Sequence, residues 1–320
     1  MGLDTASVMF LCAARSMGVD FADTLMIGRQ TFWPDAAALR RVFDVLGVDH
    51  DADQFAQQNK YAEPFFSLLG ASEISSLDVS AYEKASIIHD MNLPVPPDLR
   101  ERFSVVHDGG TIEHVFNIPQ ALKNCMEMVR VGGHFTQVNV ANNYMGHGFW
   151  QFSPELIFRA FSADNGYQIE AVLLHEVVPG GAWYRVSDPD EIRSRVELCN
   201  DQPPYILTIA RRIAKTEIFA RPPQQSDYVA LWDRTLNPPA PTPTPQQSAA
   251  SATNGNGHTA AATWRSYLPG PLKRSIKSVA SVARQLRGED DTKIKRGFDG
   301  CGYRRIAEDD LLRGKLLAAV

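Results

Sequence analysis

Residues 103–138, FSVVHDGGTIEHVFNIPQALKNCMEMVRVGGHFTQV, decide the fold class of this 320-residue chain. The apolar run 103–106 leads into His107-Asp108-Gly109-Gly110, and apolar residues then recur at helical spacing up to Gly132-Gly133. A glycine pair just past such a segment is typical of a helix end, because glycine adopts positive φ angles at little cost. A second β-rich run covers 135–140. The order strand, polar loop, helix, glycine stop and strand predicts one βαβ unit of a parallel sheet.

Residues 3–211 alternate between helix and strand patterns in the same way. The strand patterns cover 23–27, 73–79, 85–89, 167–175 and 205–211, and the helix patterns cover 3–18, 34–46, 63–69, 153–163 and part of 182–198. This alternation predicts an α/β fold with a Rossmann-like, doubly wound and mostly parallel sheet. Ligands of such sheets bind at the carboxyl ends of the strands, which directs attention to residues 108–113.

The composition is that of a soluble globular protein, with 44% hydrophobic and 22% charged residues. We find no secretory signal pattern and no apolar run long enough to span a bilayer. The four cysteines are far apart and form no CxxC pair, so the sequence indicates neither a disulfide framework nor a zinc site. We expect a cytoplasmic location. We also expect no metal, because no cluster of histidines and carboxylates has ligand spacing.

The charge is unevenly distributed along the chain. Residues 263–320 carry 13 Lys and Arg against 7 Asp and Glu, whereas the preceding residues carry 19 against 30. Residues 237–262 consist mainly of Pro, Ala, Thr, Ser, Gly and Gln, a composition that cannot bury a core. We therefore predict a helical lead-in (1–22), a Rossmann-like domain (23–236), a disordered linker (237–262) and a basic amphipathic helical tail (263–320).

The predicted tail has two possible roles. Lysine and arginine beside an apolar helix stripe suit the anionic inner face of a membrane, as a peripheral contact. The same surface suits docking on the acidic body or on another protein. Nucleic acid is not an expected partner, because the sequence shows no recognition fold and the body is acidic.

Five features of the chain follow the order of a known family. They are a strand ending at Gly28, Asp78, the segment Asp90-Met91-Asn92, the segment DGGTIEHV at 108–115, and Gly132-Gly133 before a strand. Over residues 20–212 the chain resembles the class I S-adenosylmethionine-dependent methyltransferases. The most specific fragment is "EHV" followed by "VGG", which is similar to the family's "LEH…KPGG" signature.

The resemblance implies S-adenosylmethionine as the cofactor and a role for each matching residue. Gly28 would allow the backbone to approach the cofactor, and Asp78 would hold the ribose hydroxyls. Asp90, with Met91 or Asn92, would contact the adenine. Residues 108–110 (Asp108, Gly109 and Gly110) would face the methyl donor.

The first turn departs from the family's glycine-rich GxGxG pattern. Here Gly28 is followed by Arg29, Gln30, Thr31 and Phe32, so two glycines that permit close approach are missing. Either Arg29 and Gln30 turn away and bond the cofactor's carboxylate, or the pocket is altered. Asp78 and Asp90 also have an ordinary alternative, since aspartate at a strand end often forms an Asx-turn.

The loop NNYMGHGFWQ, 142–151, is the stretch best suited to substrate chemistry. Gly146 and Gly148 flank His147 and leave its imidazole accessible for taking a proton from an acceptor. His114 is a second catalytic candidate, although it and His147 also fit ordinary helix and loop histidines. Trp150 and Phe152 suit either stacking on an acceptor or core packing.

We therefore expect a methyltransferase that acts on a small-molecule or glycan-type acceptor, most simply by O-methylation. The alternative from another class is a catalytically degenerate methyltransferase fold that serves as a binding or scaffolding protein. The altered turn at Arg29 and Gln30 motivates this alternative.

Overall fold

The computed structural model describes residues 2–192, 195–196, 198, 200–236 and 302–316. The chain divides into one unit of residues 1–230 and 297–320 and a second unit of residues 231–296. The predicted linker and the larger part of the predicted tail lie outside the described residues. The second unit is described only for 231–236, the end of helix α7 (Ser226–Leu236). All that follows concerns the first unit.

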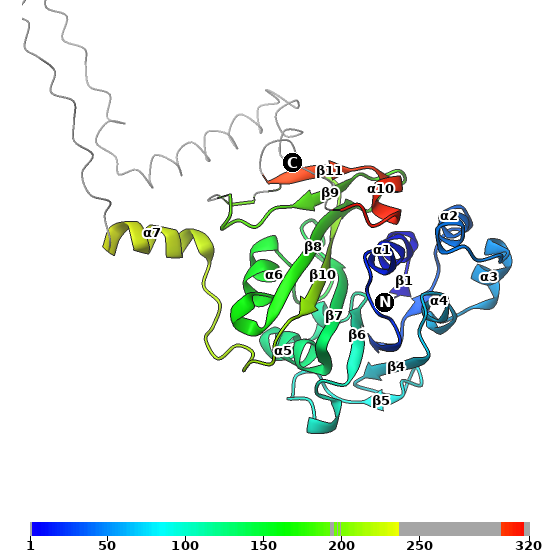
Figure 1. Ribbon diagram of the computed structural model, residues 1–320, viewed down its shortest axis with the longest axis horizontal. Coiled ribbons are helices and arrows are strands. Elements are labelled where there is room, and N and C mark those ends of the chain that lie inside the picture. Colours follow the sequence, from blue (N-terminus) through cyan, green and yellow to red (C-terminus); the bar gives the residue numbers. More distant parts are fainter. Residues whose placement is uncertain (1, 193–194, 197, 199, 237–301, 317–320) are drawn as a thin grey trace, which may run out of the picture. The chain divides into compact units, whose positions relative to one another are not determined.

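A nine-stranded sheet forms the centre of the first unit (Figure 1). Its order is β11-β9-β8-β10-β7-β6-β2-β4-β5. The strands are β2 (Asp23–Ile27), β4 (Glu73–Asp78), β5 (Ile87–Ile88), β6 (Phe103–Asp108), β7 (Val129–Val140), β8 (Tyr167–Glu176), β9 (Trp183–Val186), β10 (Pro204–Arg212) and β11 (Tyr303–Ile306). The pairs among β5, β4, β2, β6 and β7 are parallel, and the remaining pairs are antiparallel. Because only β10 and β9 oppose the other strands, the predicted doubly wound, mostly parallel sheet is confirmed.

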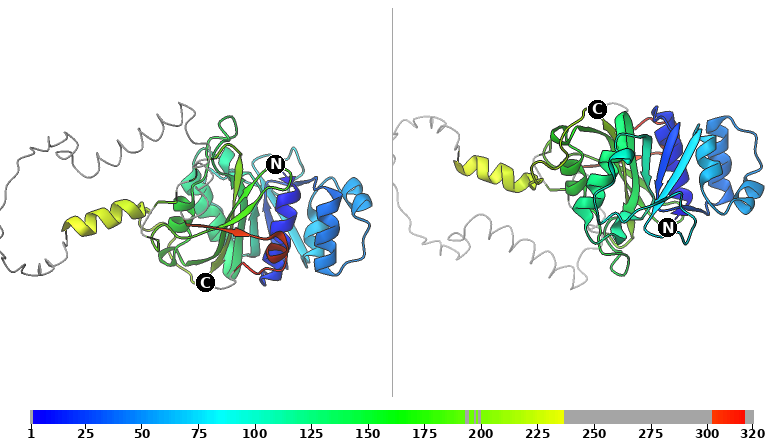
Figure 2. Two further views of the ribbon diagram at one scale, coloured as in Figure 1. Left: turned by 90° about the horizontal axis from the view of Figure 1, so that it is seen from above. Right: turned by 90° about the horizontal axis from the view of Figure 1, so that it is seen from below.

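Helices cover both faces of the sheet, as two views at right angles to Figure 1 also show (Figure 2). Helices α1 (Thr5–Ser16), α2 (Ala36–Leu46), α3 (Ala52–Gln58) and α4 (Glu63–Leu68) lie on one side, and α5 (Ile118–Met128) and α6 (Pro154–Ala160) lie on the other. Alternate strand residues supply the two cores: Met26 packs with the α1 side, whereas Leu25 and Ile27 pack with the α5 side. This alternation follows from the two-residue period of a strand.

The helices begin where the sequence supplies caps. The side chains of Asp4, Asp35 and Ser153 accept hydrogen bonds from the backbone amides of Ser7, Ala38 and Leu156. Each bond satisfies an amide that the first helical turn leaves unpaired. Pro154 occupies the first turn of α6, as the Ser-Pro-Glu pattern at 153–155 predicts.

The glycine pair Gly132-Gly133 is not a helix stop. Helix α5 ends at Met128, and β7 begins at the next residue and runs through both glycines. The pairing of β6 with β7 shifts register between Phe103 and Val105, and Gly132 has a φ of +88°. A Cβ on Gly133 would lie 2.6 Å from the carbonyl oxygen of Ser104. The pair therefore marks a β-bulge, where close backbone approach requires glycine.

Two further elements differ from the sequence predictions. The long helix begins only at Ile118, and Ile112–His114 forms a separate 3-10 turn, so Glu113 is not in the helix's first turn. Pro119 near the helix start accounts for the later beginning. The segment predicted to hold a helix between β8 and β10 instead provides strand β9 within its described residues.

The two ends of the described chain are integral parts of the first unit. Helix α1, which lies in the predicted helical lead-in, is buried along most of its length. Strand β11 pairs with β9, and α10 (Glu308–Leu312) buries Leu311 and Leu312 against the same core as α1. The prediction of a tail is thereby corrected for residues 302–316, which are part of the folded unit. Arg41 of α2 forms ion pairs with Glu308 and Asp309 beside it.

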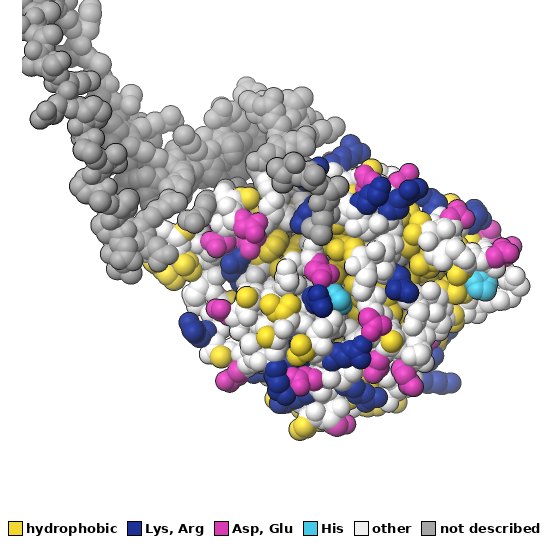
Figure 3. Space-filling model, in the orientation of Figure 1, with side chains coloured by type: hydrophobic (Ala, Val, Ile, Leu, Met, Phe, Trp, Pro, Cys, Tyr) yellow, Lys and Arg dark blue, Asp and Glu magenta, His cyan; other side chains and the backbone are white. Residues whose placement is uncertain are grey.

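The surface seen in the orientation of Figure 1 carries lysines and arginines interspersed with acidic side chains (Figure 3). No helix within the described ranges is both long and apolar enough to cross a membrane.

Candidate functional site

The site begins where the strand order reverses between β2 and β6. The two strands are parallel neighbours, but the chain continues from β2 toward β4 on one side and from β6 toward β7 on the other. Gly28 follows β2 with a φ of +71°, and Asp108 ends β6. A crevice at such a reversal is the usual ligand site of an open α/β sheet.

A cavity of about 550 Å³ lies beside this point. Its lining comes from the ends of β7 and β10, the turn after β6, the loop after β7, the N-terminal segment and Trp33. The lining residues are Gly2, Ser7, Trp33, Gly109, Gly110, Glu113, His114, Val138, Val140, Tyr144, His147 and Tyr205. The predicted residues His114, His147, Gly109 and Gly110 therefore share one cavity. Gly28, Asp78 and Asp90 are not among its lining residues.

Two buried carboxyls and one amide form the floor of the site. Asn139 Nδ2 donates to Asp108 Oδ2 at 2.6 Å and to Glu113 Oε2 at 2.8 Å. Asp108 Oδ1 accepts from the backbone amides of Thr111 and Ile112. Burial, together with the charge of Glu113, raises the pKa of Asp108 to about 8. Burial raises the pKa of Glu113 to about 7. The pair therefore carries fewer than two negative charges at neutral pH.

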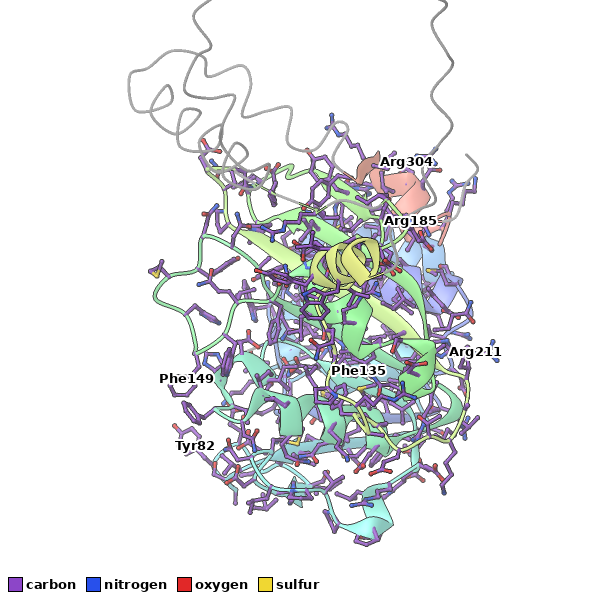
Figure 4. The ribbon with its side chains drawn as sticks, turned by 90° about the vertical axis from the view of Figure 1, so that its left-hand side faces the viewer. Tyr82, Phe135, Phe149, Arg185, Arg211 and Arg304 are labelled. Carbon is purple, nitrogen blue, oxygen red and sulfur yellow. The ribbon has the colours of Figure 1, made fainter. Side chains whose placement is uncertain are left out.

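The loop after β7 is fastened to the turn that carries Glu113. The carbonyl oxygen of Glu113 accepts the amides of Phe149 at 2.8 Å and Trp150 at 3.2 Å. Trp150 Nε1 also donates to the carbonyl oxygen of Val115 at 3.0 Å. Figure 4 labels Phe149 at the base of this projecting loop. These bonds hold His147 close to the turn.

The fastening brings together three residues that could bind a cation or move a proton. His147 Nε2 lies 3.6 Å from Glu113 Oε1, and the rings of His147 and His114 are 4.9 Å apart between centroids. The ligand atoms of all three residues lie within 4.8 Å of one another. The fold therefore brings together two histidines and a carboxylate whose spacing in the sequence does not indicate a metal site. Partial burial and the neighbouring His147 lower the pKa of His114.

The residues predicted to bind the ribose and adenine lie at the ends of β4 and β5. Asp78 Oδ1 accepts from the amide of Ser80 at 2.9 Å, and Asp90 Oδ1 accepts from the amide of Asn92 at 2.9 Å. These bonds are the Asx-turns of the alternative interpretation. The bonds from Asn92 lower the pKa of Asp90. Met91 is buried in the core on the α5 side, and Asn92 Oδ1 accepts from the amide of Asn117.

The turn after β2 is occupied by its own side chains. Arg29 Nε donates to Glu63 Oε1 at 2.7 Å, and Arg29 lies over the ring of Tyr61. Its guanidinium therefore points to protein partners. Gln30 is fully buried and donates to the carbonyl oxygens of Ile27 and Gly28. A Cβ on Gly109 would lie 2.7 Å from Gln30 Oε1, so Gly109 makes room for Gln30 as well as for any ligand.

A fit to S-adenosylmethionine can be judged residue by residue. Asp78 and Asp90 are partly exposed carboxylates at adjacent strand ends, as a ribose and an adenine would require. The positive φ of Gly28 provides the glycine conformation expected at the first turn. The nucleoside end therefore fits the residues present, whereas Arg29 and Gln30 restrict the space for the methionine end.

Four contributing residues were missed from the sequence. Asn139 lies near the end of strand β7 and belongs to no sequence motif. A buried polar residue at such a position is nevertheless a useful indication of a functional site, because buried polar groups need hydrogen-bond partners. Trp33, Tyr144 and Tyr205 provide aromatic surface to the cavity, and the rings of Tyr144 and Tyr205 are stacked with centroids 6.0 Å apart. Phe152 lies in the core instead, and Trp150 is half exposed outside the lining.

No protein-family model and no curated protein sequence matches the chain. Among solved structures, a Bacillus halodurans C-125 protein proposed to be a methyltransferase is 13% identical, with 67% of this chain and 100% of that chain covered and a TM-score of 0.38. A geranyl diphosphate methyltransferase in complex with S-adenosylmethionine is 14% identical (65% and 85% covered, TM-score 0.34). A Thermotoga maritima S-adenosylmethionine-dependent methyltransferase is 13% identical (64% and 89% covered, TM-score 0.33).

Because these identities and TM-scores are low, the fold assignment rests on the strand order and directions of the sheet. The chain has the Rossmann-like α/β fold that its resemblance to the class I methyltransferases implies.

Proposed function

We propose that this protein is an S-adenosylmethionine-dependent methyltransferase that methylates a hydroxyl group of a small, saccharide-like molecule. The observation that carries this proposal is the cavity beside the β2 and β6 strand ends, which contains His147, His114 and the buried Glu113. It combines a place for an acceptor with groups able to take its proton.

The proposed cofactor residues are Gly28, Asp78, Asp90 and the neighbouring Met91 and Asn92. When bound, S-adenosylmethionine supplies an electrophilic methyl group attached to a sulfonium sulfur. Asp78 and Asp90 orient the nucleoside end through carboxylate oxygens at adjacent strand ends. The backbone at Gly109 and Gly110 directs the methyl donor toward the cavity, where Gly110 has a φ of +85°.

His147 is proposed to take the acceptor's proton. Its imidazole is exposed to the cavity and faces the carboxylate of Glu113, which stabilises the imidazolium that forms. With its proton transferred to His147, the acceptor oxygen would be able to accept the methyl group, and the cofactor's sulfur would keep the electron pair of the bond that breaks. His114 orients the acceptor beside His147. Positioning of the two reactants accounts for most of the rate gain.

The lining of the cavity favours a polar acceptor with flat apolar faces. Tyr144, Tyr205 and Trp33 provide ring surface to the cavity, and His114 and His147 provide polar groups. Aromatic faces combined with polar groups are suited to saccharide rings, which present both C–H and hydroxyl surfaces. This lining supports the proposed acceptor class.

Isothermal titration of the full-length protein with S-adenosylmethionine tests the proposal at its first step. We expect saturable binding of one cofactor per chain, followed by transfer of a labelled methyl group to members of a saccharide panel. Absence of a heat signal at high micromolar cofactor would contradict the enzymatic function.

A second candidate function is a methyltransferase fold retained for binding alone. The buried Gln30 and the Arg29–Glu63 ion pair, which fill the first turn, favour this candidate. The variant Gln30→Gly separates the two. If the wild-type protein does not bind S-adenosylmethionine but Gln30→Gly does, the fold has lost cofactor binding through this side chain.

The proposed location is the cytoplasm, with a small-molecule acceptor as the main partner. We also propose a peripheral contact with a membrane or with another protein through residues 263–320. This proposal does not include the part of that range that forms β11 and α10. Liposome flotation with and without the segment between the two described parts, 237–301, tests it, and equal recovery would contradict membrane contact.

A further inference from the structure

We propose that Glu113, His114 and His147 bind a divalent transition-metal ion in the cavity. Their ligand atoms lie within 4.8 Å of one another, and they are the one such group of three among the residues that the structure describes. Two imidazoles and one carboxylate are a donor set used by first-row transition metals.

The geometry requires only small side-chain movements. Ligand bonds of about 2.0 to 2.2 Å require donor atoms about 3 to 3.5 Å apart. His147 Nε2 and Glu113 Oε1, at 3.6 Å, are already close to this separation. His114 and His147 are exposed, so their rings can rotate toward the ion without disturbing the core. The amides of Phe149 and Trp150 hold the loop in place.

The orientation of Glu113 is an independent observation that points to a cation. Its side chain is 1% exposed, and Oε2 accepts a hydrogen bond from Asn139 Nδ2. Its other oxygen, Oε1, is buried and has no hydrogen-bond partner in the described part of the chain. Leaving a buried carboxylate oxygen unpaired is costly, and an ion bound there would remove that cost. Asn139 acts as a positioning residue because it fixes which oxygen faces the histidines.

The donor set favours manganese, iron, cobalt or zinc over magnesium. Imidazole nitrogens suit these ions, whereas magnesium prefers oxygen ligands alone. Three protein ligands leave further coordination positions open toward the cavity. Such open positions are typical of sites where a metal binds substrate rather than only stabilising the fold.

The bound ion also refines the acceptor class, an extension that rests on the proposed methyl transfer. An ion with open positions would chelate two neighbouring oxygens of a vicinal diol, as saccharides present. A coordinated hydroxyl loses its proton to solvent more readily, because the ion stabilises the alkoxide. His147 is therefore a ligand when the ion is bound, and it acts as the base only in the protein without the ion.

Titration of the untagged full-length protein with MnCl₂ and ZnCl₂, without cofactor or acceptor, tests the site directly. The protein is first treated with a chelator and dialysed. We expect one ion per chain, and an absorption spectrum of the Co²⁺ form that is typical of nitrogen and oxygen ligands. His114→Ala and His147→Ala should each weaken binding at least about tenfold. His50→Ala, which removes an exposed histidine outside the cavity, should stay within about twofold.

Failure of this proposal is distinguishable from failure of the proposed function. Absence of stoichiometric binding, or equal affinity in His147→Ala and His50→Ala, would overturn the metal site. If the protein still bound S-adenosylmethionine, methyl transfer with His147 as the base would stand. Metal binding that depends on His147 supports the site even if the cofactor does not bind. Thermal unfolding of each variant verifies that the fold is retained.

Discussion

A Cβ atom on Gly148 would lie 2.8 Å from the carbonyl oxygen of Glu113. Gly148 also has a φ of +67°, which side chains other than glycine's rarely adopt. The loop after β7 therefore reaches the Glu113 turn only because residue 148 has no side chain. This contact sets the distance between His147 and Glu113.

Gly148→Ala should lower the free energy of unfolding by about 1 to 3 kcal/mol. Alanine is strained in the left-handed conformation, and its Cβ displaces the loop. It should also weaken Mn²⁺ binding, since His147 moves with the loop. Gly146→Ala is the matched control: its Cβ would meet no atom within 4 Å. Urea denaturation and metal titration of both variants measure the difference. Equal behaviour of the two would contradict the importance of the contact.

Asp78→Ala should weaken S-adenosylmethionine binding at least about tenfold, because hydrogen bonds to a charged group contribute more than neutral ones. The competing explanation is that Asp78 only stabilises its Asx-turn with Ser80. Asp78→Asn keeps a side-chain oxygen that accepts from the backbone amide of Ser80, and so keeps the turn, but it removes the carboxylate. Calorimetric titration of both variants separates the roles. An unchanged affinity in Asp78→Ala would remove this residue from the site.

His175 makes stability depend on pH. Burial lowers its pKa from 6.5 to about 4, with Asp4 and Glu308 acting in the opposite direction. The unfolded chain therefore binds more protons between these values, so stability is lost as the pH falls from about 6.5 toward 4. The contribution of His175 between pH 7 and pH 5 is roughly 2 kcal/mol.

His175→Phe preserves a ring against Trp183, whose centroid lies 4.0 Å from that of His175. The variant should lose less stability than the wild-type protein when urea denaturation is repeated at pH 7 and pH 5. Comparing the two proteins cancels the effect of other buried histidines, such as His107. Equal losses would show that His175 is not the titrating group.

Leu311→Ala should destabilise the first unit by about 2 to 4 kcal/mol, because the leucine is fully buried beside α1. The same result is not expected for a residue that belongs to a solvated tail. Asp310→Ala, at the exposed neighbouring position, should change stability by less than about 0.5 kcal/mol. Thermal denaturation measures both. A small effect of Leu311→Ala would argue against docking of α10.

Most of the sheet can be predicted from the sequence because its strands are short apolar runs that end in glycine or aspartate. β2, β4 and β6 follow this pattern, and their boundaries agree with the predictions within a few residues. The pattern fails at Gly132-Gly133, since a glycine that permits a bulge and one that ends a helix look alike in sequence. It fails again at β11, because residues 303–306 form a short run in which two of the four residues are arginines.

The site is predicted less completely, for a different reason. His147 stands between two glycines in a polar loop, and this local signal was sufficient to select it. The cluster with Glu113 and His114 depends on a loop folding back onto a turn, which no spacing rule expresses. Asn139 carries no local signal because its role appears only when Asp108 and Glu113 approach it from another element.

The contact between α1 and α10 has a consequence for synthesis. Ser16 Oγ donates to the carbonyl oxygen of Leu312 at 2.9 Å, across 296 positions in the chain. A ribosome adds about 5 to 20 residues per second, so it makes α10 roughly 15 to 60 s after it has made α1. During that time the apolar surface that α10 later covers is open to solvent. Chaperones would therefore find their target on helix α1, and folding of the first unit would be completed only once α10 has been made.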